Sequence, residues 1–165
     1  MNDDPTPQRR CFLDALTVLA RWSLGALFVY MGWQKVLDPV AFMKMVRQYD
    51  MVQSSLVLNS IAAALPWFEV YCGLLLLAGI AVRGTALVLI GMLAPFTFAV
   101  LHRALAIYAT QAIAFCAIKF DCGCGPGEEY ICVKLPLNCI LILLSAWLLS
   151  GRGRQLCARY SVIQD

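Results

Sequence analysis

Long apolar segments separated by short polar ones dominate the chain. A helix needs roughly 20 predominantly apolar residues to cross a bilayer, and four segments have about that length. We predict spans over about residues 12–37, 61–82, 84–101 and 133–150. Only Arg83 separates the second predicted span from the third, so we expect these two to form an antiparallel hairpin. The pattern predicts an all-α fold: a four-helix transmembrane bundle in a single domain.

Two further segments fit a span less well. Residues 40–60 follow Asp38-Pro39, where proline lacks an amide donor and ends the first helix. They mix apolar and charged side chains, which is typical of an amphipathic helix lying in the membrane interface. Residues 104–118 are apolar but short. Because the segment is short for a span, we expect a bent continuation, a re-entrant piece or an interfacial helix there. A fifth span would move either the termini or the Cys122 loop to the opposite face of the membrane.

Composition supports a membrane protein. Hydrophobic residues make up 61% of the chain and charged residues 14%, whereas a soluble domain carries roughly 25% charged residues. The first apolar run is too long for a cleavable signal peptide, so we expect it to be retained. The net charge is +3, but the basic residues form no stripe with aromatic residues between them. This argues against nucleic acid as a partner.

A glycine-rich loop carries the most distinctive chemistry. Of eight cysteines, four lie in this loop or at its borders: Cys116, Cys122, Cys124 and Cys132. The Cys122-Gly123-Cys124 thiols could cycle to a disulfide, which would be strained and therefore oxidising. They could instead pair crosswise with Cys116 and Cys132 as structural staples. They could also bind a soft metal ion, with two further ligands from the same set. We expect redox or staple use rather than a metal site.

Ionisable groups inside the predicted spans are the second signal. Arg21 lies in the first span and Glu69 in the second, and a charge there costs several kcal/mol unless it is paired or wet. We predict that the two form a buried ion pair. Glu69 could alternatively serve as a proton carrier or as a ligand group for a quinone-like molecule, with Gln34 and Lys35 nearby. The single histidine, His102, cannot supply the bis-histidine ligation of membrane haem.

Orientation follows from charge and redox logic. In a four-span topology Arg9, Arg10, Arg83 and the arginines after residue 150 fall on one side, which the positive-inside rule assigns to the cytoplasm. Thiols that cycle through disulfides do so most readily on an oxidising face. We therefore expect an inner-membrane, multi-pass protein with the Cys122 loop outside the cytoplasm.

The order of these motifs resembles that of the DoxX-like and MauE-like redox-associated membrane proteins. The resemblance runs from Arg21 to Leu149 and rests on Arg21, Gly25, Phe28, Gly32, Lys35, Asp38-Pro39 with Phe42, Leu65-Pro66-Trp67-Phe68-Glu69, Gly73, Leu76, Gly79 and Asp121-Cys122-Gly123-Cys124-Gly125. It implies a four-helix bundle, thiol-disulfide or quinone-linked electron transfer, and maturation of an extracytoplasmic partner. In the MauE-like branch a phenylalanine commonly follows the second cysteine, where this chain has Gly125.

Two hypotheses of function follow. In the first, the protein is a membrane redox accessory whose Cys122 and Cys124 exchange electrons or disulfides with an extracytoplasmic redox protein. In the second, it is a non-catalytic accessory subunit that packs against a larger membrane electron-transfer complex, and its cysteines only staple the loop.

Overall fold

The computed structural model describes residues 7–48, 54–111, 113–121 and 128–150. Within these ranges, four helices are long and apolar enough to cross a membrane: α1 (Pro7–Leu37), α3 (Ser55–Ala78), α4 (Val82–Gln111) and α5 (Ile131–Leu149). A short helix, α2 (Pro39–Gln48), follows α1, and two three-residue strands, β1 (Lys119–Asp121) and β2 (Glu128–Tyr130), precede α5. The predicted all-α membrane bundle is confirmed, with a small hairpin that the sequence pattern did not indicate.

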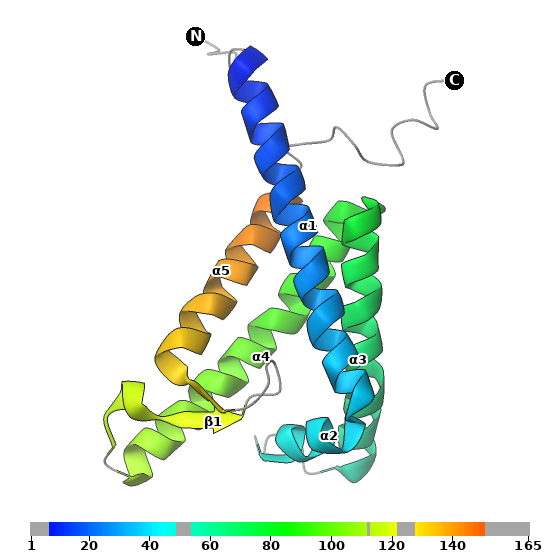
Figure 1. Cartoon of the computed structure of the whole chain (residues 1–165). Coiled ribbons are helices and arrows are strands. Elements are labelled where there is room, and N and C mark those ends of the chain that lie inside the picture. The colour runs from blue at the N-terminus through cyan, green and yellow to red at the C-terminus, as the bar shows by residue number, and fades with distance from the viewer. Residues whose placement is uncertain (1–6, 49–53, 112, 122–127, 151–165) are drawn as a thin grey trace.

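The four long helices alternate in direction along the chain (Figure 1). The start of α1, the turn from α3 to α4 and the end of α5 lie at one end of the bundle. Helix α2 and the hairpin lie at the other end, which we call the hairpin end (Figure 1). This is the four-span arrangement, so the hairpin and α2 share a face of the membrane.

The bundle consists of two helix pairs. Helix α1 packs along α3 and α4 packs along α5, with fewer contacts between the pairs, and the pairs diverge toward the hairpin end (Figure 1). The apolar core divides accordingly. A first cluster takes side chains from all four spans, namely Leu24, Phe28, Cys72, Leu76, Ala86, Leu89, Leu93, Leu141 and Leu148. A second, nearer the hairpin, joins only α4, α5 and the segment before β1 through Val100, Ala104, Ile118 and Ile131.

Helix α4 takes one of the three forms expected for residues 104–118, a continuation of the preceding span. It continues past His102 and Arg103 to Gln111, so the predicted third span and most of the segment 104–118 form one helix. No proline or glycine occurs from Phe96 to Gln111, and His102 lies near Phe98 with ring centroids 6.4 Å apart. A helix of 30 residues rises about 45 Å, which exceeds the hydrocarbon thickness of about 30 Å, so α4 must tilt or extend beyond it.

The turn from α1 into α2 and the end of α3 have clear local causes. Asp38 caps α2, because its Oδ1 accepts a hydrogen bond of 3.0 Å from the Ala41 amide, and Pro39 takes the first helical position, which suits proline. At the C-terminal end of α3, Gly79 adopts a left-handed φ of 73° and closes the helix in the manner of a Schellman cap. The turn therefore lies at residues 79–81, and Arg83, which we expected to be the link, is already inside α4.

Three glycines let α1 and α3 approach closely. A Cβ placed on Gly73 would lie 2.7 Å from the Gly25 carbonyl oxygen, and one placed on Gly32 would lie 2.8 Å from the Pro66 carbonyl oxygen. Within a bilayer the hydrophobic effect does not drive helices together, because lipid tails are as apolar as the side chains. Small residues at a helix interface instead allow close van der Waals packing. These three glycines therefore have a packing role, whereas a Cβ placed on Gly84 or Gly91 would meet no atom within 4 Å among the described residues.

We predict that Gly73→Ala destabilises the bundle, because its methyl group would press on the backbone of α1. Overpacking of this kind costs about 1–3 kcal/mol. Thermal unfolding of the purified protein in detergent should show a lower midpoint for Gly73→Ala. Gly91→Ala is the matched control, since it adds the same methyl group where there is space. Equal midpoints for the two variants would contradict the close approach of α1 and α3.

Candidate functional site

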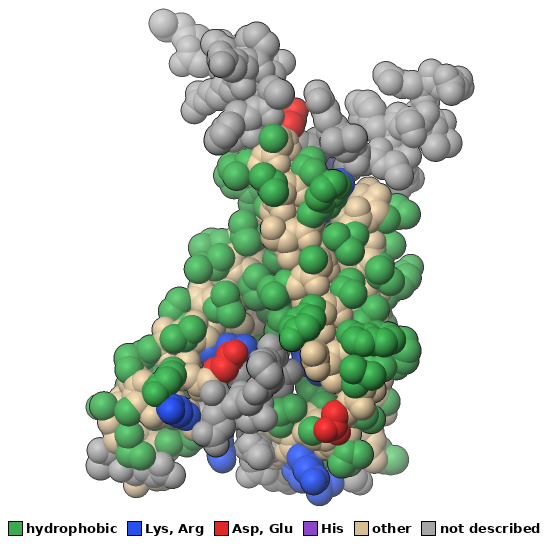
Figure 2. Space-filling view, in the orientation of Figure 1, with side chains coloured by type: hydrophobic (Ala, Val, Ile, Leu, Met, Phe, Trp, Pro, Cys, Tyr) green, Lys and Arg blue, Asp and Glu red, His purple; other side chains and the backbone are tan. Residues whose placement is uncertain are grey.

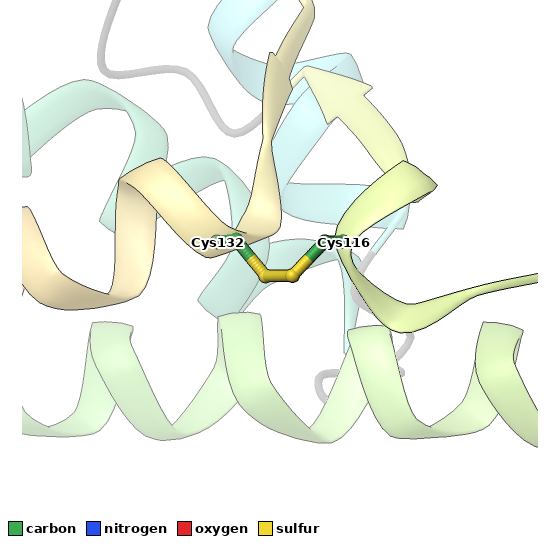
Figure 3. The surroundings of a disulfide bond; sticks show 2 residues. All are labelled: Cys116 and Cys132. Carbon is green, nitrogen blue, oxygen red and sulfur yellow. A yellow bond between two sulfur atoms is a disulfide. The ribbon is translucent and has the colours of Figure 1, made fainter.

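A disulfide closes the base of the hairpin. Cys116 lies in a single 3₁₀ turn, η1 (Phe115–Ala117), and Cys132 is the second residue of α5. The two are bonded to each other, with Cα atoms 5.1 Å apart (Figure 3). The bond thereby ties the segment that leaves α4 to the start of α5.

The hairpin inside this bond is also held by its backbone. Strands β1 and β2 pair in antiparallel fashion, with Lys119 opposite Tyr130 and Asp121 opposite Glu128. The Ile131 amide donates a hydrogen bond of 3.2 Å to the Ile118 carbonyl. Residues 122–127 connect the two strands, so Cys122 and Cys124 lie outside the described residues while the stem on both sides is defined.

The disulfide narrows the alternatives for the four loop cysteines. With Cys116 and Cys132 bonded to each other, neither can staple Cys122 or Cys124 crosswise. Neither is a thiolate, and only a thiolate serves as a metal ligand. In this state the loop therefore keeps Cys122 and Cys124 as its remaining pair of sulfur atoms.

Charged side chains anchor the hairpin to α5. Lys134 Nζ lies 2.7 Å from Glu129 Oε2, and the Lys134 side chain is only 3% exposed. The Lys119 ammonium lies 4.3 Å from the centre of the Tyr130 ring, a favourable cation–π distance. Sequence reasoning missed the Glu129–Lys134 pair. Opposite charges flanking a helix start could have signalled it.

A second charged cluster lies at the same end, between α1, α2 and α3. Lys35 Nζ contacts both carboxylate oxygens of Glu69, at 2.6 and 2.7 Å, and lies 5.2 Å from the centre of the Phe42 ring. All three residues are buried. On the face seen in Figure 2, hydrophobic side chains cover the helices along their length, and most charged side chains gather at the hairpin end.

The cation beside Glu69 is thus Lys35, and the predicted Arg21–Glu69 pair is a wrong assignment. Since Gly25 lies against Gly73, Arg21 stands about eight residues, or about 12 Å, beyond Glu69 along α3. Helical side chains also lean toward the N-terminus of their own helix. In an antiparallel pair this brings Lys35 and Glu69 together and carries Arg21 and Glu69 apart.

The other candidates from the sequence take peripheral positions. Trp33 and Trp67 are 52% and 59% exposed on the helix surface. Gln34 and His102 are exposed as well. Cys72 is a buried free thiol, which fits a packing role for a cysteine within a span, and Cys139 is an exposed free thiol.

We predict that Lys35 and Glu69 are coupled in stability and that Arg21 and Glu69 are not. Removing one partner of a buried pair leaves an uncompensated charge and costs about 3–5 kcal/mol. Lys35→Met and Glu69→Leu should each lower the midpoint of unfolding in detergent, and the double variant should recover most of the loss. Arg21→Met combined with Glu69→Leu is the control cycle, where the effects should add. Additive effects for Lys35 and Glu69 would contradict the pairing.

Comparison with known proteins identifies the family of this chain. A family model described as methylamine utilisation protein MauE matches residues 13–151. The match includes all four spans, α2, the hairpin and both charged clusters. No curated protein and no solved structure gives a match. The MauE-like part of the predicted resemblance is confirmed, and the DoxX-like part stays a prediction. This multi-pass membrane protein belongs to the MauE family.

Proposed function

We propose that the protein is a redox accessory of the inner membrane whose Cys122 and Cys124 exchange disulfides with a protein outside the cytoplasm. The observation that carries the proposal is the Cys116–Cys132 bond. It occupies two of the four loop cysteines and leaves one close pair, spaced by a single glycine, at the tip of an anchored hairpin.

The chemistry is a thiol-disulfide exchange. A thiolate of the reduced partner attacks one sulfur of the Cys122–Cys124 disulfide, and a mixed disulfide forms while the other cysteine leaves as a thiolate. The partner's second thiolate then attacks the mixed disulfide. The partner gains a disulfide, and Cys122 and Cys124 become thiols. A disulfide ring that spans one residue is strained, which favours transfer in this direction.

The stem of the hairpin suits this role. Backbone pairing, the Cys116–Cys132 bond and the Glu129–Lys134 pair hold both strands. The strands that flank the Cys122–Cys124 segment are thereby tied to the start of α5 at the hairpin end of the bundle (Figure 1). We propose that the partner engages the protein at this end.

The family description suggests the class of partner. Its words concern methylamine utilisation, so we propose that the partner is a disulfide-bearing extracytoplasmic protein of such a pathway, which this protein helps to mature. The second hypothesis, a non-catalytic subunit of a larger complex, predicts instead that the protein purifies in a stoichiometric complex and that its thiols do not change state.

We predict that Cys122 and Cys124 change redox state in cells while Cys116 and Cys132 stay bonded. Trapping with an alkylating reagent before and after mild reduction, followed by mass-spectrometric mapping, should show two thiols that become labelled. In Cys124→Ser, the Cys122 thiolate should attack the disulfide of the oxidised partner, whose other sulfur leaves as a thiolate, and the resulting mixed disulfide should be visible as a reducible adduct because Cys124 cannot resolve it. Cys139→Ser, which removes an exposed free thiol on α5, is the control: its Cys122 and Cys124 should become labelled as in the wild type, and it should form no trapped adduct.

The proposal has a clear contrary outcome. If the double variant Cys122→Ser, Cys124→Ser supported disulfide formation in extracytoplasmic proteins as well as the wild type does, the redox role would be abandoned.

A further inference from the structure

Helix α2 turns across the end of the bundle instead of continuing α1. A single residue, Asp38, separates the two helices, and α2 lies across the hairpin end (Figure 1). Phe42 is only 4% exposed, and its ring lies beside the buried Lys35 ammonium. The Phe42 side of α2 therefore packs on the bundle. The opposite side turns outward, at the level where α1 ends.

The outward side of α2 carries two basic residues. Val40, Lys44 and Arg47 are spaced by four and three positions, which places them on one side of a helix, and all three are exposed. Lys44 follows Phe42 by two positions, which is slightly more than half a helical turn. The basic side of α2 is thus opposite the side that packs on the bundle.

These two cations differ from the lysines around them. Lys35 and Lys134 each have a carboxylate partner, and Lys119 lies over the Tyr130 ring. Neither Lys44 nor Arg47 makes an ion pair with a described residue. Two exposed cations one helical turn apart therefore attract an anion from outside the chain.

The exposed residues that precede the cations indicate where this anion comes from. Trp33, Leu37 and Val40 are 52%, 65% and 54% exposed. Exposed side chains thus change from apolar to basic along the chain, from the last turns of α1 into α2. A phospholipid changes in the same order, from its acyl chains to its phosphate. Free phosphate or the carboxylates of a partner protein would match the cations alone, so this order favours a lipid.

We propose that Lys44 and Arg47 bind the phosphate of an anionic phospholipid whose acyl chains lie beside Leu37 and Val40. Arginine suits phosphate because its planar guanidinium donates two parallel hydrogen bonds. Basic residues at a membrane surface attract lipids with a net negative charge. A zwitterionic lipid brings its own cation and is held less strongly. Binding of this lipid does not depend on Cys122 or Cys124.

The test is photolabelling of the whole protein in nanodiscs of phosphatidylcholine. The probe is a trace of phosphatidylglycerol with a diazirine in its acyl chain. Label should map to residues 37–48, and unlabelled phosphatidylglycerol should displace it. The double variant Lys44→Gln, Arg47→Gln should reduce the label on α2 by about tenfold. Lys119→Gln is the matched control, since it removes an exposed cation at the same end of the bundle, and it should keep the wild-type label on α2.

Four results would overturn the proposal. Absence of label on α2 would leave the cations to a protein partner. Displacement of the label by inorganic phosphate would indicate a site for a free anion. Equal labelling of the double variant and the wild type would exclude recognition by these two residues. An equal loss of label in Lys119→Gln would indicate only a diffuse positive field.

Stability separates lipid binding from a structural role of the two side chains. Both are exposed, so the double variant should unfold at the wild-type midpoint in lipid-free detergent. Added phosphatidylglycerol should raise the midpoint of the wild type and not that of the variant, because a ligand stabilises the folded state that binds it. A lower midpoint of the variant without lipid, or an equal rise in both proteins, would contradict the proposal.

Discussion

The close contact of α1 with α3 sets the register on which the hairpin end depends. Gly25 and Gly73 bring the two backbones together, and at that register the leaning side chains of Lys35 and Glu69 meet. A shift of one helical turn, about 5.4 Å, would separate them and leave two charges unpaired in a low-dielectric interior. The same pair holds Phe42, and with it α2, against the bundle. Packing of small residues thus decides where charge can be buried.

At the hairpin end, the two helix pairs carry different chemistry. The α1–α3 pair satisfies its charges internally through Lys35 and Glu69. The α4–α5 pair carries the disulfide-closed hairpin and, one to two turns into α5, a buried donor at Asn138 without a partner among the described residues. The buried Lys35–Glu69 ion pair fits a structural role.

The sequence predicted the features that depend on composition and local chemistry. Apolar runs predicted the spans, and Asp38-Pro39 predicted the end of α1. What it missed depends on geometry between helices. The partner of Glu69 was misassigned because counting residues from helix ends ignores both the glycine-set register and the lean of side chains. The extent of α4 was left open among three alternatives, because His102 and Arg103 were taken as a boundary, although neither residue breaks a helix. Asn138 gave no signal, since burial without a partner is visible only in three dimensions.

The central claim is that the hairpin and α2 lie together on the extracytoplasmic face, opposite the turn between α3 and α4. Single cysteines introduced at Lys44, Arg83 or Lys119 in a cysteine-free background test it most directly, with a membrane-impermeant maleimide applied to intact cells. Our account predicts labelling at positions 44 and 119 and protection at position 83 until the membrane is opened. Labelling at position 83, or different outcomes at 44 and 119, would contradict it.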